Sequence, residues 1–337
     1  MRRTELDLCR IFACLLILMI HAAADIYHAL PLSGAAFFAV TFLSTLSRAG
    51  LPLFFMLTGT LLLSREKLDV KQNFRHRVLR YTGMYYLWSL LYALARAASG
   101  ALEGPSDFLY AVIAGHYHLW FLPAMVMVCL FLPVVHAALH GRNLDGRYIV
   151  GLFLFLGVFL VNCNLTPDPA PVLYRFTQNF SLDYLPYLGY SVWGWYLSKR
   201  ECSRRTLLLA PLAFLAVTLA ASVLNRWYSL YKNTADGWLF HFFSLPTFLE
   251  ATAAYCFFLA MKGRAIRRVK LVTELSACTL GVYLLHPLLI NVLERLGLSP
   301  TPAAPVSSLL VFYLALAAAC FALTFLLRRI PLVKRLF

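Results

Sequence analysis

The stretch Arg10-Ile-Phe-Ala-Cys-Leu-Leu-Ile-Leu-Met-Ile-His21 lies in the first membrane-length apolar run of the chain. Ten apolar residues separate its two polar ends. A helix turns about 100° per residue, so eleven steps bring His21 to within about 20° of the face that carries Arg10 and about 16 Å further along. We therefore expect Arg10 at the inner membrane surface and His21 above it, near the middle of the bilayer. An ionisable residue at that depth indicates a function.

The composition predicts a membrane protein. Of the 337 residues, 61% are hydrophobic and 13% are charged, whereas a soluble protein carries about 25% charged residues. A span needs about 20 apolar residues, so we expect an all-α, polytopic protein with about ten transmembrane helices, forming one integral-membrane domain over residues 1–337. The expected spans are 8–27, 36–63, 80–99, 117–139, 148–163, 182–198, 207–225, 239–261, 274–295 and 306–327.

Basic residues gather between alternate apolar runs. With a cytoplasmic N-terminus, the inner segments hold 24 of the 30 lysines and arginines, which is the positive-inside pattern. We therefore expect both termini in the cytoplasm. The net charge of +15 then indicates membrane lipids with anionic headgroups, and not nucleic acid, as the partners of these clusters.

Arg10 and His21 each allow two interpretations. A neutral histidine can take a proton from a hydroxyl as a general base, and an arginine can hold phosphates through several fixed donors. Alternatively, Arg10 is an interface anchor that pairs with Asp7, three residues earlier, and His21 is a packing histidine. Asp25, one turn beyond His21, either orients its ring or lies at the outer surface.

Three further arginines fall at expected membrane positions. Arg48 lies inside the second span, where a permanently charged guanidinium needs either a cavity or an ion-pair partner. Arg77 and Arg80 stand three residues apart at the entry of the third span. They could bind a polyphosphate together with Arg10, or they could be ordinary positive-inside charge.

Two other histidines lie in apolar surroundings. His118 opens the fourth span, where it would either touch an acceptor substrate or belong to the aromatic belt of the interface. His286 lies within the ninth span and precedes Pro287, which loosens the local backbone. It would either take part in the function or pack between helices. The sequence contains no local signature of a metal site, a nucleotide-binding loop or a serine hydrolase.

Several motifs, taken in order, resemble the acyltransferase type 3 family of bacterial membrane O-acyltransferases. They are Arg10-x10-His21, Ser47-Arg-Ala-Gly-Leu-Pro-Leu-Phe-Phe-Met-Leu-Thr-Gly59, Arg77-x-x-Arg80, Tyr117-His-Leu-Trp-Phe121 and Ser276-x-x-Thr-Leu-Gly-Val-Tyr-Leu-Leu-His286-Pro. The chain looks most like stand-alone members that acetylate surface-polysaccharide precursors, such as those of enterobacterial common antigen. It departs from the pattern at Ile11, where many members have a small residue, and at Gly83, where many have a proline.

This resemblance implies an enzyme of the bacterial inner membrane. The implied reaction moves an acyl group, by default acetyl, from cytoplasmic acyl-CoA to a hydroxyl of a cell-surface glycan or lipid-linked precursor, without a metal. The resemblance implies that Arg10 clamps the donor, that His21 is the catalytic histidine and that Arg48, Arg77 and Arg80 are donor-site arginines. We predict that the site residues are His21 and Arg48 in catalysis, Arg10, Arg77 and Arg80 in donor binding, and His118, Trp120 and His286 in acceptor binding.

Two other classes of function remain open. In a transporter or flippase of a lipid-linked glycan, the buried arginines and histidines would line a translocation path. In a membrane sensor module they would bind a ligand without chemistry. The sequence shows no internal repeat, which counts against a transporter. The oligomeric state stays open between a monomer and a homo-oligomer.

Overall fold

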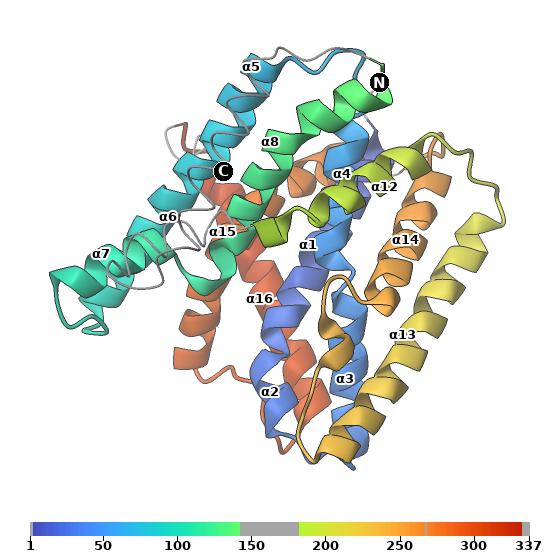
Figure 1. Ribbon diagram of the computed structural model, residues 1–337. Helices are drawn as coiled ribbons and strands as arrows, with labels where there is room; N and C mark the ends of the chain where they lie inside the picture. The colour runs from blue at the N-terminus through green and yellow to red at the C-terminus, as the bar shows by residue number, and fades with distance from the viewer. Residues whose placement is uncertain (1–2, 142–181, 267, 332–337) are drawn as a thin grey trace. The chain divides into compact units, whose positions relative to one another are not determined.

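The computed structural model describes residues 3–141, 182–266 and 268–331 (Figure 1). Every regular element in these ranges is a helix, and none is a strand. The all-α prediction is therefore confirmed for this part of the chain. The expected span 148–163 lies outside the described residues.

Six helical segments are long and apolar enough to cross a membrane. They are Thr4–Ala29, Ala35–Leu62, Pro105–Leu139, Thr206–Lys232, Val269–Arg295 and Pro305–Leu327. The expected spans 80–99 and 239–261 correspond to α6 (Leu79–Ala98) and the shorter apolar helix α14 (Leu245–Ala260). The expected span 182–198 contains α12 (Tyr187–Ser198), which has 12 residues. The protein is thus a helical membrane protein, whereas ten spans and two cytoplasmic termini stay predictions.

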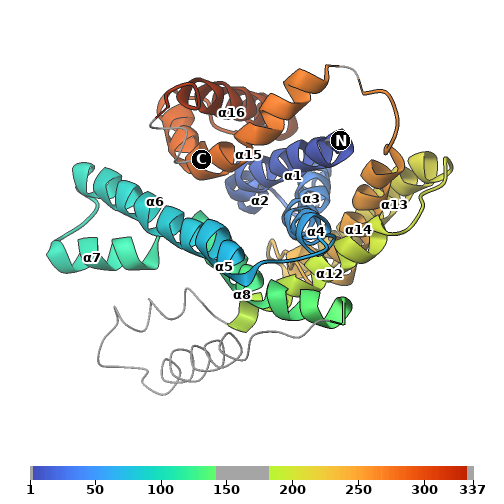
Figure 2. The ribbon, with the colours of Figure 1, turned by 90° about the horizontal axis from the view of Figure 1, so that it is seen from above.

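The described chain divides into two compact units, Met1–Leu57 with Tyr196–Phe337, and Thr58–Trp195. In the first unit, α1 lies between the pair α15 and α16 on one side and α3, α13 and α14 on the other (Figure 2). α1 is thereby the central helix of this unit. The remaining bounds are α1 (Thr4–Ala22), α2 (Ala24–Ala29), α3 (Ala35–Ser47), α4 (Gly50–Leu62), α13 (Thr206–Lys232), η5 (Trp238–Phe240), α15 (Val269–Arg295) and α16 (Pro305–Leu327).

The expected second span is two helices. α3 ends at Ser47 and α4 begins at Gly50. Pro52 has no N–H to bond the carbonyl of Arg48, so the helical ladder is interrupted where Arg48 stands. Gly50 then permits close packing on α1, since a Cβ there would lie 2.8 Å from the Ala13 carbonyl oxygen. The break and the close approach together place Arg48 beside the central helix.

In the second unit, α6 packs against α7 and α8. Tyr85 Oη of α6 donates to the carbonyls of Ile113 (3.1 Å) and Ala114 (2.8 Å). Gly115 has a positive φ of 70°, and a Cβ there would lie 2.5 Å from Tyr85 Oη. The tight turn before the fourth expected span therefore requires glycine. The unit's other elements are α5 (Val70–Asn73), η1 (Phe74–Val78), α7 (Pro105–Ala114), η2 (Tyr117–Trp120), α8 (Phe121–Leu139) and η4 (Leu182–Tyr184).

Candidate functional site

Arg10 is held at the start of α1 by a polar cluster. Its Nη1 donates to Ser276 Oγ of α15 at 3.2 Å and lies 3.6 Å from Asp7 Oδ1. Ser276 Oγ in turn donates to Asp7 Oδ1 at 2.7 Å. Asp7 and Ser276 are buried, so this end of the guanidinium is fixed by two groups from two helices.

The cluster leaves part of the guanidinium accessible. The Arg10 side chain is 30% exposed, and both of its close polar contacts use the same nitrogen, Nη1. The pairing with Asp7 that the sequence suggested is therefore present, but it involves only Nη1 of the Arg10 guanidinium. An arginine oriented on one edge and open on the other is suited to binding an incoming anion.

His21 and His286 lie against each other in the middle of the first unit. Their ring centroids are 4.6 Å apart. His286, on α15, is fully buried, and His21, on α1, is half-buried. His286 was expected to contact the acceptor substrate, and the structure adds a direct neighbour for it that the sequence did not indicate.

The tautomer of His286 follows from its surroundings. Its Nδ1 lies 2.7 Å from the carbonyl oxygen of Tyr283. A carbonyl only accepts, so Nδ1 carries the proton, and in the neutral ring Nε2 is then the acceptor. This hydrogen bond fixes the plane of His286 beside His21. Asp25, the other candidate partner of His21, is exposed, which favours its surface interpretation.

Arg48 has an aromatic neighbour. Its guanidinium carbon lies 4.4 Å above the centre of the Phe240 ring, and Tyr27 contacts the same ring with centroids 5.3 Å apart. Within the described ranges, no carboxylate lies within 4.0 Å of Arg48, and its buried Nε has no hydrogen-bond partner. The ion-pair alternative is therefore not supported there, and the group retains a buried donor.

Arg77 and Arg80 belong to the second unit and differ in exposure. Asn73 Nδ2 donates to the Cys129 carbonyl at 2.8 Å, and Arg77 Nη1 lies 3.4 Å from Asn73 Oδ1. Arg77 is half-buried and Arg80 is exposed. Burial, reinforced by Arg65, lowers the pKa of Arg77, although an arginine stays charged at neutral pH.

A π-helical turn, η1, ends at Val78 and α6 begins at Leu79. The change in helical pitch falls between the two arginines, so a simple three-residue spacing does not describe their relation. Arg10 lies in the other unit, and the three-arginine donor clamp stays a prediction.

His118 lies in a local aromatic cluster. It is 2% exposed, and its Nδ1 lies 2.8 Å from Nδ1 of His116. Tyr92 contacts both rings, with centroids 4.3 Å from His116 and 5.0 Å from His118. A lipid-facing belt position does not fit this burial. Trp120 stands in a separate aromatic group, 6.0 Å from Tyr184 and 5.8 Å from Tyr187 between centroids.

Sequence reasoning did not single out Glu250. This carboxylate on α14 is fully buried, and its Oε1 accepts from Thr218 Oγ1 at 2.8 Å. A single acidic residue inside an apolar run was the available signal. Ser276 appeared only as a motif residue, because nothing local indicates that it meets Arg10. Among the residues that the structure describes, no group of three or more His, Cys, Asp or Glu is placed to hold a metal ion.

Comparisons with known proteins support an acyltransferase. A family profile described as an acyltransferase domain matches residues 3–329. A relative named "Amino-acid racemase", from Enterococcus faecalis, is 26% identical over 318 residues, which are 88% of this chain and 42% of the relative. The chain thus spans less than half the length of that curated protein. No solved structure matches it.

The match of 3–329 covers nearly all of the chain, including the Arg10 cluster and the His21–His286 pair. The chain belongs to the acyltransferase type 3 family.

Proposed function

We propose that this protein is an O-acyltransferase that moves an acyl group, taken as acetyl, from cytoplasmic acyl-CoA to a hydroxyl of a cell-surface glycan or a lipid-linked precursor. The observation that carries the proposal is the His21–His286 pair, with ring centroids 4.6 Å apart. It lies on the helix that presents the half-open Arg10 guanidinium eleven residues earlier. Membership of the family supports the proposed reaction class, and the positions of Arg10, His21 and His286 support the proposed site.

The donor would enter at the Arg10 end of α1. CoA carries phosphates at one end and its thioester at the end of a long pantetheine arm. The open edge of Arg10 offers charge-assisted hydrogen bonds to a phosphate. The rise of about 16 Å along the helix from Arg10 to His21 is comparable to the reach of the pantetheine arm. Arg77 and Arg80 would supply further donors to the polyphosphate.

His21 would act as the general base. It removes the proton from the acceptor hydroxyl while the hydroxyl oxygen attacks the acyl carbon. The carbon–sulfur bond then breaks, the thiolate leaves, and the proton passes from the His21 imidazolium to the thiolate, so that CoA and an ester are the products. His286 acts as a positioning residue, because its Nδ1–H is fixed on the Tyr283 carbonyl and its ring supports that of His21.

Arg48 would stabilise negative charge. Its buried Nε donor has no partner in the described chain, and its ring contact with Phe240 leaves the polar edge of the guanidinium available. A preorganised donor of this kind can stabilise the oxyanion of an acyl transfer or hold an anionic group of the acceptor. His118 and Trp120 stay candidates for acceptor binding, and the bacterial inner membrane is the proposed location.

The name of the Enterococcus faecalis relative is the reason to weigh a function other than acyl transfer. Its name describes amino-acid racemisation, and this chain corresponds to 42% of its length. A sequence related to this chain therefore occurs in a protein named for a different reaction. In the alternative, the helices transport or sense a ligand and transfer no acyl group.

The test is acyl transfer by the purified full chain in lipid vesicles. Labelled acetyl-CoA is supplied to the vesicles, and release of the CoA thiol is followed. In a second experiment, the masses of surface glycans from cells with and without the gene are compared by mass spectrometry. We expect thiol release and a mass gain of one acetyl unit. His21→Ala should lower both by about 10²–10⁴-fold. His28→Ala, which changes an exposed histidine on α2, should leave both unchanged. Equal turnover of His21→Ala and His28→Ala at equal protein levels would contradict the role of His21. Transport without thiol release would favour the alternative.

A further inference from the structure

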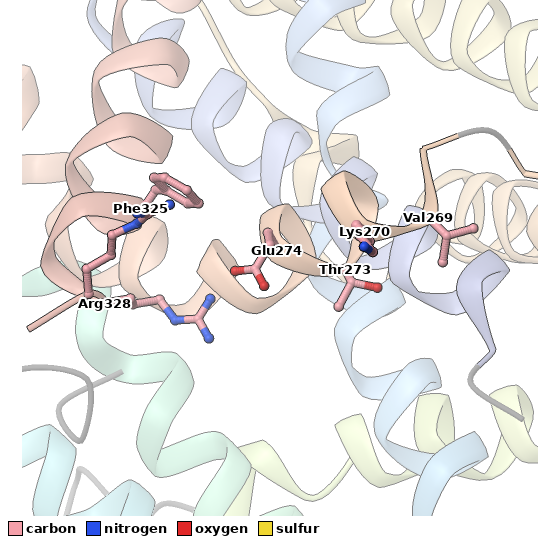
Figure 3. Close-up of a pocket in the computed structure, with 7 residues that line it drawn as sticks. Val269, Lys270, Thr273, Glu274, Phe325 and Arg328 are labelled. Atoms are coloured by element: carbon pink, nitrogen blue, oxygen red, sulfur yellow. The ribbon is translucent and has the colours of Figure 1, made fainter. Parts of the chain in front are cut away.

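A cationic pocket lies in the first unit, where α15 begins and α16 ends. It encloses about 590 Å³. One wall comes from the first turns of α15 and the other from the last residues of α16 and the segment after it (Figure 3). The lining residues are Val269, Lys270, Thr273, Glu274, Phe325, Arg328 and Arg329. The roles given above to Arg10, His21 and Arg48 use none of them.

The pocket has an excess of positive charge. Lys270, Arg328 and Arg329 contribute three cations, against the single carboxylate of Glu274. Figure 3 shows Arg328 and Glu274 pointing toward each other across the opening, yet no ion pair within 4.0 Å joins them in the described chain. The pocket therefore keeps a net charge of about +2 that its own groups do not neutralise.

The two arginines are oriented by weak contacts. Arg328 Nη1 lies 3.7 Å from the thiol of Cys278, and the Arg329 guanidinium stacks 4.6 Å from the centre of the Phe325 ring. A thiol is a weak acceptor, and a ring face uses no N–H. Most donors of both guanidinium groups thus stay available for a stronger acceptor.

We propose that this pocket binds a phosphate ester. Arginine forks match phosphate oxygens. The helix α15 begins at Val269, which lines the pocket, and a helix N-terminus carries partial positive charge. The volume falls within the range of about 300–1,000 Å³ for small-molecule sites and exceeds what a lone phosphate needs. Val269 and Phe325 supply apolar surface for the carbon attached to the phosphate.

Two phosphate esters are available at this end of the helices. The basic clusters place it at the inner membrane surface under the positive-inside rule, where both phospholipid headgroups and the adenosine phosphates of CoA occur. The lipid form of the inference is independent of the proposed reaction, whereas the CoA form rests on it. Binding and turnover are therefore measured separately.

The experiment uses the purified full chain in detergent and two probes. Adenosine 3′,5′-bisphosphate is titrated calorimetrically, and retention of phosphatidylglycerol is measured by native mass spectrometry. The double variant Lys270→Gln, Arg328→Gln should lower the affinity for the probe by about tenfold. Arg295→Gln, which removes a cation from the opposite end of the same helix, is the matched control and should change binding less than twofold.

Two more variants separate binding from a structural role. Glu274→Gln removes a negative charge that repels the phosphate, so it should tighten binding about threefold. Loss of structure cannot produce such a gain. Arg328→Lys keeps the charge and should retain most of the affinity. If the double variant loses affinity for one probe only, that probe identifies the ligand as CoA or as phospholipid. If it loses affinity for both probes, the pocket is a shared phosphate site. If neither probe binds the unaltered protein, or if the double variant binds both as the control does, the inference is overturned, even if acyl transfer is normal.

Discussion

Two of the neighbouring histidine pairs in the described chain arise in opposite ways. His21 and His286 come from different helices of the first unit, with centroids 4.6 Å apart. His116 and His118 are two residues apart in one turn of the second unit, with Nδ1 atoms 2.8 Å apart. The first pair exists because α1 packs on α15, whereas the second follows from local geometry.

The environments differ as well. His286 is fixed by a hydrogen bond to a backbone carbonyl. Its neighbour His21 is half-buried and lies eleven residues after Arg10, whose guanidinium has an accessible edge. His118 is enclosed by Tyr92 and His116. A long-range pair on a charged axis is suited to chemistry, and a local aromatic cluster is suited to shaping a surface. We therefore expect their variants to affect different steps of one reaction.

The largest effect is expected for His21→Ala. Loss of a general base lowers turnover by about 10²–10⁴-fold, measured as thiol release from acetyl-CoA. If the first pair acts as one unit, adding His286→Ala should cost little more, because residues that act together are not additive. Adding His118→Ala should multiply the losses. If the loss of turnover in the double variant of His21 and His286 equals the product of the two single losses, the two rings act separately.

Substitutions of His286 should have the next largest effect. Asn places an N–H donor close to the position of Nδ1, and Gln places one close to Nε2. If the bond to the Tyr283 carbonyl positions the pair, His286→Asn should lose about tenfold in kcat and His286→Gln about a hundredfold. The pH profile of kcat should also shift in both variants. Equal losses with an unchanged profile would indicate packing alone.

Glycine substitutions test the packing within each unit. A Cβ at Gly50 would lie 2.8 Å from the Ala13 carbonyl oxygen on α1, and one at Gly59 would lie 1.7 Å from the Ser191 carbonyl oxygen in the second unit. Overpacking costs about 1–3 kcal/mol, so both alanine variants should unfold at lower temperature. Gly83→Ala and Gly189→Ala, with no atom within 4 Å of the added Cβ, should match the unaltered protein. Gly50→Ala alone should also reduce turnover, because it displaces α1.

The smallest effect is expected for His118→Ala. If this cluster shapes the acceptor site, the KM for the acceptor should rise about tenfold, which is about 1.4 kcal/mol, while the KM for acetyl-CoA stays constant. His241→Ala, an exposed histidine of the other unit, is the control. A change in donor KM would instead connect the cluster with the CoA site.

Much of the candidate site could be predicted from local sequence. The Arg10–His21 spacing depends only on helical geometry, and the predicted Asp7 contact is present at 3.6 Å. The break at Arg48 follows from Pro52. The π-helical turn between Asn73 and α6 was not predicted. The residue before it, Asn73, donates to the carbonyl of Cys129, which is far away in the sequence, so local patterns do not reveal this contact.

The sequence by itself determined that this is a helical membrane protein of the acyltransferase type 3 family and that one helix carries an arginine and a histidine on one face. Apolar run length and helical periodicity are local properties, so they can be read along the chain. Only the tertiary structure decided that Ser276 meets Arg10, that His286 meets His21 and that Phe240 covers Arg48. Each contact joins helices far apart in the sequence, and side-chain packing between helices selects such neighbours.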